Sequence, residues 1–573
     1  MRIVVVGGVA GGMSAAARAR RLSEHAEIVV LERGSYVSFA NCGLPYHVSD
    51  EIPRRSSLLV QTPEALRAAL NLDVRTGNEV VAIDPTRRTV TAVHTTPEGS
   101  EEYVLEYDAL VLAPGAATVR PPIAGLDLPQ VHTMRTVPDA DALRAVVADG
   151  ARSAVVLGAG FIGLEVAEAL RSRGLEVDLV DLAPHVLPPL DDELASLLDA
   201  ELRGNGIRTH VGVAAEAIHA TGPRAGEGES TDADDAPSVE VSLSDGSTLA
   251  ADVVVLSVGV RPDSHLAASI GLDLAPGGAV LVDGQQRTSD PHIWAVGDAT
   301  AVRNAVTGTV GPVPLAGPAN RQGRRAADSI LGRITPEREA RGVLGTAVVR
   351  VFGLTAAMTG ASQRALQLAG IEHHTVHVHP GHHAGYFPGA EQLHLIVTFG
   401  TDGRLLGAQA VGRAGVDKRI DVLATALAAG MTADDVAELE LAYAPPYGSA
   451  KDAVNMAGFV AQNVLDGTLA LWYPHDLDTV LDSALVLDVR SAKEFSGGHL
   501  PGALNIAHTE LRGRLDEVRV AAAGRPVRVH CASGFRSYLA HRVLAQEGFD
   551  SANLSGGMLT LRAARPDLQL VRD

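Results

Sequence analysis

The sequence contains little cysteine, little lysine and few aromatic residues. Two cysteines in 573 residues cannot form a disulfide framework, so nothing indicates an oxidising compartment. Lysine occurs three times, and the net charge of −20 argues against a nucleic-acid-binding surface. No uncharged apolar run reaches the roughly 18 residues of a membrane helix, and the N-terminus lacks a signal-peptide cleavage pattern. We therefore expect a soluble cytoplasmic protein that binds neither nucleic acid nor a membrane.

The chain is long and rich in the residues of α/β cores. Its length exceeds what one core supports, and 46% of its residues are hydrophobic although only 3% are aromatic. A strand, a glycine turn and a helix follow one another over residues 2–22, with a further strand at 27–32. The same order returns over 154–173, with a strand at 176–181. We predict an α/β fold with two Rossmann-like dinucleotide-binding domains.

The first glycine turn, residues 7–12, reads Gly-Gly-Val-Ala-Gly-Gly. Glycine allows the backbone to approach a pyrophosphate at a helix N-terminus. Val9 stands where the usual pattern has its middle glycine, but Glu32 ends the next strand, where a carboxylate can bind ribose hydroxyls. A glycine-rich turn without a ligand is the alternative. The whole strand–turn–helix–strand–acid context favours a dinucleotide site.

The second glycine turn, residues 158–163, reads Gly-Ala-Gly-Phe-Ile-Gly and fits the full pattern. Asp181 ends the following strand, and no arginine comes soon after it. An acid at this place repels a 2′-phosphate, so NADH is favoured, with NADPH as the other option. Two dinucleotide sites indicate hydride relay from a nicotinamide to a flavin.

A third segment, residues 288–298, reads as a strand that ends in Asp298. It resembles the second flavin fingerprint of the two-dinucleotide flavoprotein disulfide reductases, and the likeness spans about residues 1–465. In that superfamily the terminal aspartate holds the ribityl chain of FAD. The resemblance implies FAD contacts at Gly7, Val9, Ala10, Gly11, Gly12, Glu32, Arg33, Val80, Ala113, Gly115, Asp298 and Tyr443. It implies NAD contacts at Gly158, Gly160, Phe161, Ile162, Gly163, Glu165, Asp181 and Gly259.

Cys42 lies in a polar loop just beyond the predicted FAD-binding strand, where a helix is expected to begin. A lone cysteine is commonly a small buried hydrophobe, but a helix N-terminus lowers the pKa of a thiol. Cys42 has no Cys-x4-Cys partner, so it cannot close an internal disulfide there. It must form a mixed disulfide with a small thiol, a persulfide or a sulfenic acid.

Residues 38–42, Ser-Phe-Ala-Asn-Cys, and 444–452, Ala-Pro-Pro-Tyr-Gly-Ser-Ala-Lys-Asp, closely resemble the coenzyme A-disulfide reductases and NADH-dependent persulfide reductases. The resemblance implies that Cys42 is the nucleophile facing the flavin. It also implies a homodimer in which Lys451 comes from the partner subunit. The implied coenzyme A contacts are Ser14, Arg18, Arg21, Ser38, Asn41, Asn320 and Lys451.

One part of this set has independent support from its spacing. Ser14, Arg18 and Arg21 are four and three residues apart, so they share one helix face. Two arginines on one face can grip the phosphates of coenzyme A. A solvated basic face is the alternative.

Several aromatic and histidine residues lie in the region before residue 468. Tyr443 matches a family position beside the flavin, whereas Tyr386 and Tyr447 could be active-site or interface residues. Six histidines fall within eleven residues: His373, His374, His377, His379, His382 and His383. No cysteine, carboxylate or ligand spacing such as H-E-x-x-H interleaves them. We predict a polar wall near the dimer interface and no metal site.

Cys531 follows the predicted strand 527–530 and precedes a helix at 535–547. Backbone N–H groups at such a turn stabilise a thiolate or a persulfide anion. The segment resembles a rhodanese domain through Leu-Asp-Val-Arg at 487–490 and Ser-Gly-Gly-Met at 555–558. Its Cys-x4-Arg loop is shorter than the Cys-x5-Arg phosphate cradle of related phosphatases, which implies sulfur as the ligand, with Arg536 stabilising the persulfide or its anionic partner. A catalytically inactive docking fold is the alternative.

The predicted architecture adds an α+β dimerisation domain and a small α/β rhodanese domain to the two Rossmann-like domains. The boundaries are 1–115 and 250–335 for the FAD-binding domain, 116–249 for the NAD(H)-binding domain, 336–468 for the dimerisation domain and 469–573 for the rhodanese domain. A Gly/Ser/Asp/Glu-rich stretch, 221–237, reads as a disordered hairpin extension.

The leading hypothesis is an FAD-dependent NAD(P)H oxidoreductase that reduces coenzyme A disulfide, coenzyme A persulfide or polysulfide through Cys42, while Cys531 carries sulfane sulfur. The alternative is a single-cysteine NADH peroxidase or oxidase that cycles through a sulfenic acid. It needs the nucleotide sites but not the coenzyme A contacts. A third hypothesis, from another class, is a redox-sensing binding protein that delivers sulfur to a protein partner.

Overall fold

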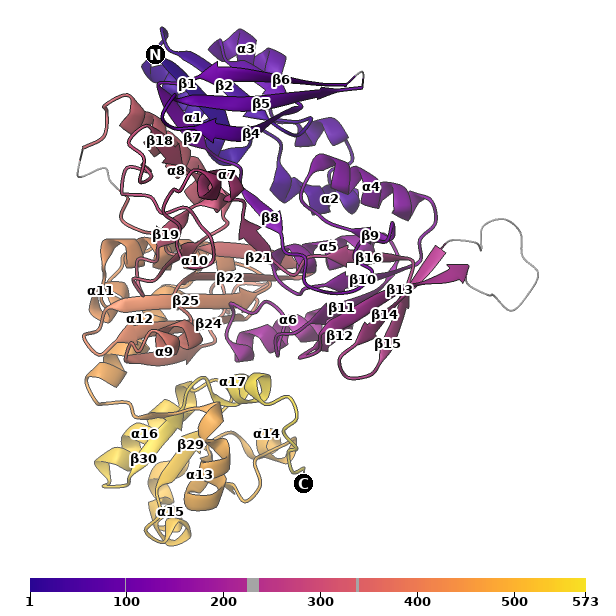
Figure 1. Ribbon diagram of the computed structural model, residues 1–573. Helices are drawn as coiled ribbons and strands as arrows, with labels where there is room; N and C mark the ends of the chain where they lie inside the picture. Colours follow the sequence, from indigo (N-terminus) through magenta and orange to yellow (C-terminus); the bar gives the residue numbers. More distant parts are fainter. Residues whose placement is uncertain (98, 224–236, 336–339, 573) are drawn as a thin grey trace. The chain divides into compact units, whose positions relative to one another are not determined.

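The two repeated strand–turn–helix segments form two parallel five-stranded sheets in the computed structural model, which describes residues 1–97, 99–223, 237–335 and 340–572 (Figure 1). The strand orders are β18-β7-β1-β2-β3 and β12-β11-β10-β16-β9. In both sheets the first strand of the glycine-turn unit lies in the middle, with its successor on one side and a later strand on the other. Ligands of doubly wound sheets bind at this reversal of strand order.

The chain divides into two compact units, 1–184 with 206–345 and 185–205 with 346–573. The parallel strands of the first unit are β1 (Arg2–Val6), β2 (Glu27–Glu32), β3 (Asp73–Thr76), β7 (Ala109–Leu112), β9 (Val131–His132), β10 (Ser153–Leu157), β11 (Glu176–Asp181), β12 (Ile207–Val211), β16 (Val253–Leu256) and β18 (Ile293–Ala295). Its helices are α1 (Ala10–Leu22), α2 (Leu44–Val48), α3 (Pro63–Leu70), α4 (Val137–Ala148), α5 (Phe161–Ser172), α7 (His265–Ser269) and α8 (Ala316–Ile330).

Four small antiparallel sheets accompany them. They are built from β4 (Asn78–Asp84), β5 (Thr89–Thr96) and β6 (Gly99–Glu106); β13 (Ala215–Pro223), β14 (Pro237–Leu243) and β15 (Thr248–Ala251); β8 (Ala116–Thr118) and β17 (Val260–Pro262); and β19 (Ala301–Arg303) and β20 (Val310–Pro312).

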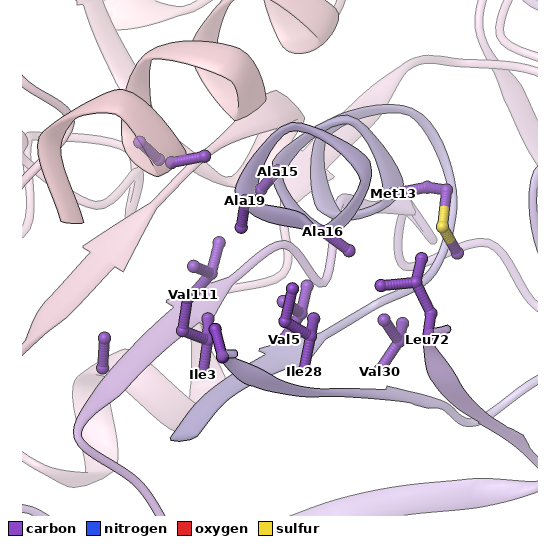
Figure 2. Packing of buried hydrophobic residues seen from close by; sticks show 14 of the residues in the cluster. Ile3, Val5, Met13, Ala15, Ala16, Ala19, Ile28, Val30, Leu72 and Val111 are labelled. Atoms are coloured by element: carbon purple, nitrogen blue, oxygen red, sulfur yellow. The ribbon is translucent and has the colours of Figure 1, made fainter. Parts of the chain in front are cut away.

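Helix α1 packs on the first parallel sheet through small side chains (Figure 2). Ala15, Ala16 and Ala19 face a layer of β-branched residues that includes Val5 and Ile28, all of them buried. Each such branched side chain contributes about 1.5–3 kcal/mol on burial. Alanine on the helix keeps the layer thin, which brings the N-terminus of α1 close to the end of β1 and positions the glycine turn between them.

The second unit contains an antiparallel sheet and a parallel sheet. The antiparallel order is β21-β22-β25-β24-β23, and the parallel order is β26-β30-β29-β27-β28. These strands are β21 (Ala347–Val351), β22 (Leu354–Gly360), β23 (His373–Val378), β24 (Leu393–Gly400), β25 (Leu405–Gly412), β26 (Leu471–Trp472), β27 (Leu485–Asp488), β28 (Leu504–Asn505), β29 (Val527–His530) and β30 (Ser551–Leu554). The helices are α6 (Asp192–Gly204), α9 (Gln363–Leu368), α10 (Val416–Ala429), α11 (Ala433–Ala437), α12 (Ala453–Leu465), α13 (Leu477–Ser483), α14 (Ala492–Ser496), α15 (Leu515–Ala522), α16 (Phe535–Gln546) and α17 (Gly557–Ala564).

The predicted α/β class, with two Rossmann-like sheets, is confirmed. The expected strand at 288–298 is shorter than predicted: β18 covers only Ile293–Ala295. The chain turns before it, where the N–H of His292 donates a 2.7 Å hydrogen bond to Oδ1 of Asp290, and again after it at Gly297, whose φ is +78°. Of the stretch 221–237, residues 224–236 lie outside the described residues. Over the part of the chain that the structure describes, no helix is long and apolar enough to cross a membrane.

Candidate functional site

The two glycine turns present helix N-termini that no side chain caps. Helix α1 follows Val9 and α5 follows Gly160, and neither residue accepts a capping hydrogen bond on its side chain. A methyl group on Gly12 would overlap the carbonyl oxygen of Gly7, and one on Gly163 would overlap that of Gly158. Backbone packs against backbone in both turns, which leaves N–H groups available to an anion. The residues present therefore fit a pyrophosphate at each turn.

The acids at the ends of β2 and β11 occupy matching places. Glu32 accepts a 2.7 Å hydrogen bond from the backbone N–H of Gly8 and a 2.8 Å bond from that of Gly34. Asp181 accepts a 2.6 Å bond from the backbone N–H of Ala159 and a 2.7 Å bond from that of Ala183. Each carboxylate is thus fixed at the rim of its glycine turn, where ribose hydroxyls of a dinucleotide bind.

Other predicted nucleotide contacts lie along the same edges. Gly115 and Gly259 have positive φ, and the carbonyl of Ala113 meets the turn at Gly7. Arg33 forms a 3.0 Å ion pair with Asp263. Burial raises the pKa of Asp298, and Arg135 opposes that rise. The remaining predicted residues lie in the glycine turns or nearby elements: Ala10 and Gly11 open α1, Phe161 and Ile162 open α5, Glu165 lies one turn into α5, and Val80 is buried in β4.

Cys42 lies in a short 3-10 turn, Asn41–Gly43, directly before α2. Cys42 is exposed, but partial desolvation and the carboxylates of Glu165 and Asp298 raise the pKa of its thiol. The prediction that a helix N-terminus lowers this pKa is wrong here. Helix α2 has only five residues, so its dipole is small, and desolvation together with two negative charges outweighs it.

Glu165 is held near the thiol by an aromatic residue of α2. The hydroxyl of Tyr46 donates a 3.0 Å hydrogen bond to Oε1 of Glu165, which links α5 to the segment that carries Cys42. A predicted NAD contact and the predicted redox cysteine therefore lie close together within the first unit. Ser38, at the start of the cysteine loop, has a φ of +46° and donates its backbone N–H to the carbonyl of Gly8.

The predicted coenzyme A face on α1 lies against α8. A methyl group on Gly323 would overlap the carbonyl of Gly11, so the two helices approach closely. The hydroxyl of Ser14 donates a 2.6 Å hydrogen bond to Asn320, and Arg18 forms a 2.7 Å ion pair with Asp328. The tertiary structure thus brings Ser14 and Asn320 together.

Sequence reasoning missed the basic residues of α8. Arg321 is exposed on this helix, and burial followed by the charge of Arg321 lowers the pKa of Arg325. Together with exposed Arg21 on α1, these side chains make the helix pair more basic than α1 alone. The signal was the run Arg-Gln-Gly-Arg-Arg directly after Asn320.

The predicted residues of the dimerisation segment lie in the second unit. The hydroxyls of Tyr386 and Tyr443 are 2.7 Å apart. Tyr386 is 76% exposed, Tyr443 46% and Tyr447 72%, so all three are available to another surface. Lys451 is also exposed and lies two residues before the start of α12.

Two of the clustered histidines contact the rhodanese-like segment. Nδ1 of His377 lies 2.7 Å from the hydroxyl of Ser555, and Nε2 lies 2.7 Å from Oε1 of Glu193 on α6. Nε2 of His379 lies 2.8 Å from the hydroxyl of Thr560 on α17. The histidine pair therefore holds the edge strand β23 against β30 and α17. Within the described ranges, no three or more His, Cys, Asp or Glu side chains gather as a metal site.

Replacing His377 by alanine should lower the free energy of unfolding of the second unit by about 3 kcal/mol, because the buried carboxylate of Glu193 loses the ring nitrogen that lies 2.7 Å from it. The side chains are 2% and 13% exposed. Denaturant titration measures the loss. His475→Ala is the matched control, since His475 is 77% exposed and should change stability by less than about 0.5 kcal/mol. Equal midpoints for the two variants would contradict the prediction.

Cys531 lies at the end of β29, and its side chain is buried. Its Sγ accepts hydrogen bonds of 3.2 Å from the backbone N–H of Gly534 and from the hydroxyl of Ser537. Its carbonyl accepts a 2.9 Å bond from the N–H of Met558 on α17. Donors thus converge on the sulfur, as a thiolate or persulfide anion requires.

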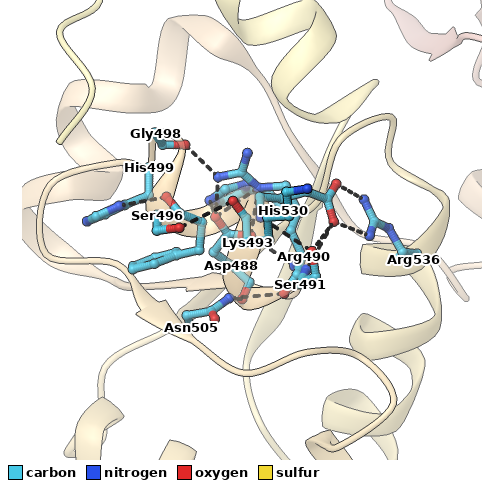
Figure 3. Close-up of polar contacts among 12 residues, drawn as sticks. Asp488, Arg490, Ser491, Lys493, Ser496, Gly498, His499, Asn505, His530 and Arg536 are labelled. Atoms are coloured by element: carbon cyan, nitrogen blue, oxygen red, sulfur yellow. Dashed lines mark hydrogen bonds and ion pairs between the residues drawn. The ribbon is translucent and has the colours of Figure 1, made fainter. Parts of the chain in front are cut away.

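The guanidinium of Arg536 does not point into open space (Figure 3). It donates bonds of 2.8 and 2.7 Å to the two carboxylate oxygens of Glu494 on α14. Glu494 belongs to a segment that resembles rhodanese domains, but sequence reasoning assigned this residue no role at the site. The signal was Ser491-x-x-Glu494, a capping-box pattern, and the structure confirms that box.

Comparisons with known proteins agree with this geometry. Residues 1–323 match the pyridine nucleotide-disulphide oxidoreductase family, 346–454 its dimerisation domain and 474–564 the rhodanese-like domain. A coenzyme A disulfide reductase of Staphylococcus haemolyticus is 34% identical over 467 residues, 81% of this chain and 100% of that protein.

Two solved structures are similar over nearly the whole chain. Reduced Bacillus anthracis CoADR-RHD superimposes with a TM-score of 0.93 at 41% identity, covering 100% of this chain and 99% of that one. An NAD-dependent persulfide reductase from A. fulgidus gives 0.87 at 37% identity, covering 98% and 100%. The resemblance inferred from the cysteine loops is confirmed. The chain belongs to the pyridine nucleotide-disulphide oxidoreductase family and carries a C-terminal rhodanese-like domain.

Proposed function

We propose that this protein is an NADH-dependent flavoprotein that reduces coenzyme A persulfide or coenzyme A disulfide at Cys42 and carries sulfane sulfur on Cys531. The observation that carries the proposal is the placement of the two cysteines in separate parts of the chain. Cys42 has no partner cysteine beside it, and the other cysteine lies in a rhodanese-like loop. A small thiol must then resolve the intermediate on Cys42. The names of the similar proteins support coenzyme A as that thiol.

The balanced reactions are coenzyme A persulfide + NADH + H⁺ → coenzyme A + hydrogen sulfide + NAD⁺, and the corresponding cleavage of the disulfide to two thiols. FAD and NADH, when bound, would supply the electron pair. The glycine turn at Gly12 with Glu32 would hold FAD, and that at Gly163 with Asp181 would hold NADH. Cys42 attacks the substrate sulfur as a thiolate, and coenzyme A thiol or sulfide leaves. Because desolvation and the two nearby carboxylates raise the pKa of Cys42, the thiolate needs cationic or cofactor surroundings to form.

The remaining assignments belong to this proposal. Ser14, Arg18, Arg21, Ser38, Asn41 and Asn320 bind coenzyme A, Lys451 reaches the site from the partner subunit of a homodimer, and Tyr443 lies beside the flavin. The match of residues 346–454 to a dimerisation domain supports that assembly. We propose the domain boundaries that the sequence predicts. They are 1–115 with 250–335 for the FAD-binding domain, 116–249 for the NAD(H)-binding domain, 336–468 for the dimerisation domain and 469–573 for the rhodanese domain.

The test supplies NADH with coenzyme A persulfide, coenzyme A disulfide, hydrogen peroxide or oxygen in separate reactions. The proposal expects sulfide release from the persulfide and thiol release from the disulfide. Faster NADH oxidation with peroxide or oxygen, without sulfide release, would instead favour the peroxidase or oxidase. Low turnover on every substrate, with tight binding to another protein, would favour a sulfur-delivery protein.

The basic face of α1 offers a substrate-specific prediction. Arg21→Ala should raise the KM for coenzyme A disulfide about tenfold, since a charge-assisted contact to phosphate is lost. The KM for inorganic polysulfide, which has no phosphates, should not change. Arg87→Ala is the matched control, because Arg87 is 82% exposed in another part of the same unit. If Arg21→Ala raised the KM for coenzyme A disulfide and for inorganic polysulfide equally, a contact between Arg21 and phosphate would be refuted.

A further inference from the structure

The ion pair between Arg536 and Glu494 engages both terminal nitrogens of the guanidinium in the rhodanese-like loop (Figure 3). Both carboxylate oxygens accept a hydrogen bond, at 2.8 and 2.7 Å, and the side chains of Arg536 and Glu494 are 28% and 37% exposed. A bidentate pair of this kind has directional strength as well as charge compensation. Glu494 raises the pKa of Arg536, and Arg536 lies close enough to Cys531 for the cysteine to add to that rise. With Glu494 in place, however, the positive charge that Arg536 would offer to an anionic substrate is already compensated.

Glu494 is fixed from its other side as well. The hydroxyl of Ser491 donates a 2.8 Å hydrogen bond to Oε2, and the backbone N–H of Ser491 donates one of 3.1 Å. These bonds form the capping box at the start of α14. The hydrogen bonds from Arg536, and then those from Ser491, lower the pKa of Glu494 to about 2. The negative charge stays at this place across the physiological pH range.

The other charged groups close to the loop are balanced too. Arg490 and Asp488 form a buried ion pair at 2.6 Å. Burial lowers the pKa of His530, next to Cys531, to about 4, so this histidine is neutral at physiological pH. The guanidinium groups of Arg490 and Arg536 each have a carboxylate partner. The sulfur site thus has hydrogen-bond donors but no net positive charge among these groups.

We propose that Glu494, acting through Arg536, makes the Cys531 site selective for alkyl persulfides over dianionic sulfur donors such as thiosulfate. The inference rests on the proposed sulfur transfer at Cys531. A loop that binds a dianion needs uncompensated positive charge, because desolvating the anion is costly. Backbone and hydroxyl donors suffice for a persulfide, which is neutral when protonated.

The two reactions differ in charge and not in bond chemistry. With a persulfide, the Cys531 thiolate forms a bond to the outer sulfur of R–S–SH, the R–S bond to that sulfur breaks, and R–S⁻ leaves with the electron pair, giving Cys531–S–SH. With thiosulfate, the thiolate forms the same bond, and sulfite leaves with the electron pair, giving Cys531–S–S⁻. Cyanide regenerates the thiolate in both cases as thiocyanate. Only the thiosulfate reaction brings a dianion against a thiolate.

The test measures thiocyanate formed from thiosulfate and from glutathione persulfide by the full chain carrying Cys42→Ser, so that Cys531 alone accepts sulfur. Glu494→Gln keeps the capping box, since glutamine serves at that position, and frees the charge of Arg536. We expect kcat/KM with thiosulfate to rise about tenfold and that with glutathione persulfide to change less than about twofold. A general structural effect would move both donors together.

Two further variants separate charge from shape. Glu547→Gln removes an exposed carboxylate after α16 and should leave the ratio of the two donors unchanged. The double variant Glu494→Gln with Arg536→Gln restores the charge balance and should return that ratio to the starting value. An unchanged ratio in Glu494→Gln, or a proportional fall with both donors, would overturn the inference. The assay uses neither NADH nor Cys42, so it fails independently of the reductase proposal, whereas no thiocyanate from either donor would reject sulfur transfer itself.

Discussion

Replacing Cys42 by serine should reduce NADH-dependent sulfide release from coenzyme A persulfide at least about a thousandfold. A serine hydroxyl is a weak nucleophile at neutral pH and cannot form a disulfide or a persulfide. No second cysteine stands beside Cys42 to take over, because the other one lies in the rhodanese-like domain. Stopped-flow measurement of NADH oxidation, together with sulfide assay, reports the loss. A reductive titration should also lose the charge-transfer absorbance between thiolate and oxidised flavin.

The matched control is Cys531→Ser. It should abolish thiocyanate formation from a persulfide while coenzyme A disulfide reduction continues within about twofold, because that reaction needs only Cys42. Cys42→Ser should instead lose coenzyme A disulfide reduction and retain thiocyanate formation from a persulfide. Full sulfide release by Cys42→Ser would remove this cysteine from the mechanism. Loss of both activities in each single variant would show that the two cysteines act as one unit.

Gly12→Ala should yield protein without bound flavin, whereas Gly163→Ala should keep flavin and raise the KM for NADH at least about tenfold. The physical reason is the same at both positions: the added methyl group would overlap the carbonyl oxygen of the first glycine of its turn. That oxygen belongs to the backbone, so the turn must open and its N–H groups move away from the pyrophosphate. The flavin absorbance spectrum and NADH titration measure the two losses.

The pair of variants also tests which turn holds which nucleotide. Gly204→Ala is the control, because a Cβ at this last residue of α6 has nothing within 4 Å. It should retain flavin and NADH affinity. Far-UV circular dichroism establishes that each variant is folded. If Gly12→Ala retained flavin and Gly163→Ala lost it, FAD would be assigned to the turn at Gly163 and NADH to the turn at Gly12.

Local sequence patterns determined most of the fold. The strands predicted at Glu27–Glu32, Glu176–Asp181 and Val527–His530 have those bounds in the structure. Hydrophobic alternation, glycine turns and the acids that end strands all depend on neighbours within one supersecondary unit. They can therefore be recognised from the sequence. The solitary Cys42, the second Cys531 and the two glycine turns needed no tertiary information, and these are the features that indicated the family.

Tertiary structure decided what surrounds those residues. The pKa of Cys42 is raised, against the sequence expectation, by desolvation and by Glu165 and Asp298, which lie far from it along the chain. Glu193 meets His377 across 184 residues, and His377 meets Ser555 across 178. Arg536 meets Glu494 across 42 residues, which changes an apparently free cation into a compensated one. Electrostatic interactions act through space, so the order of residues along the chain specifies which charges exist, and only packing specifies which of them meet.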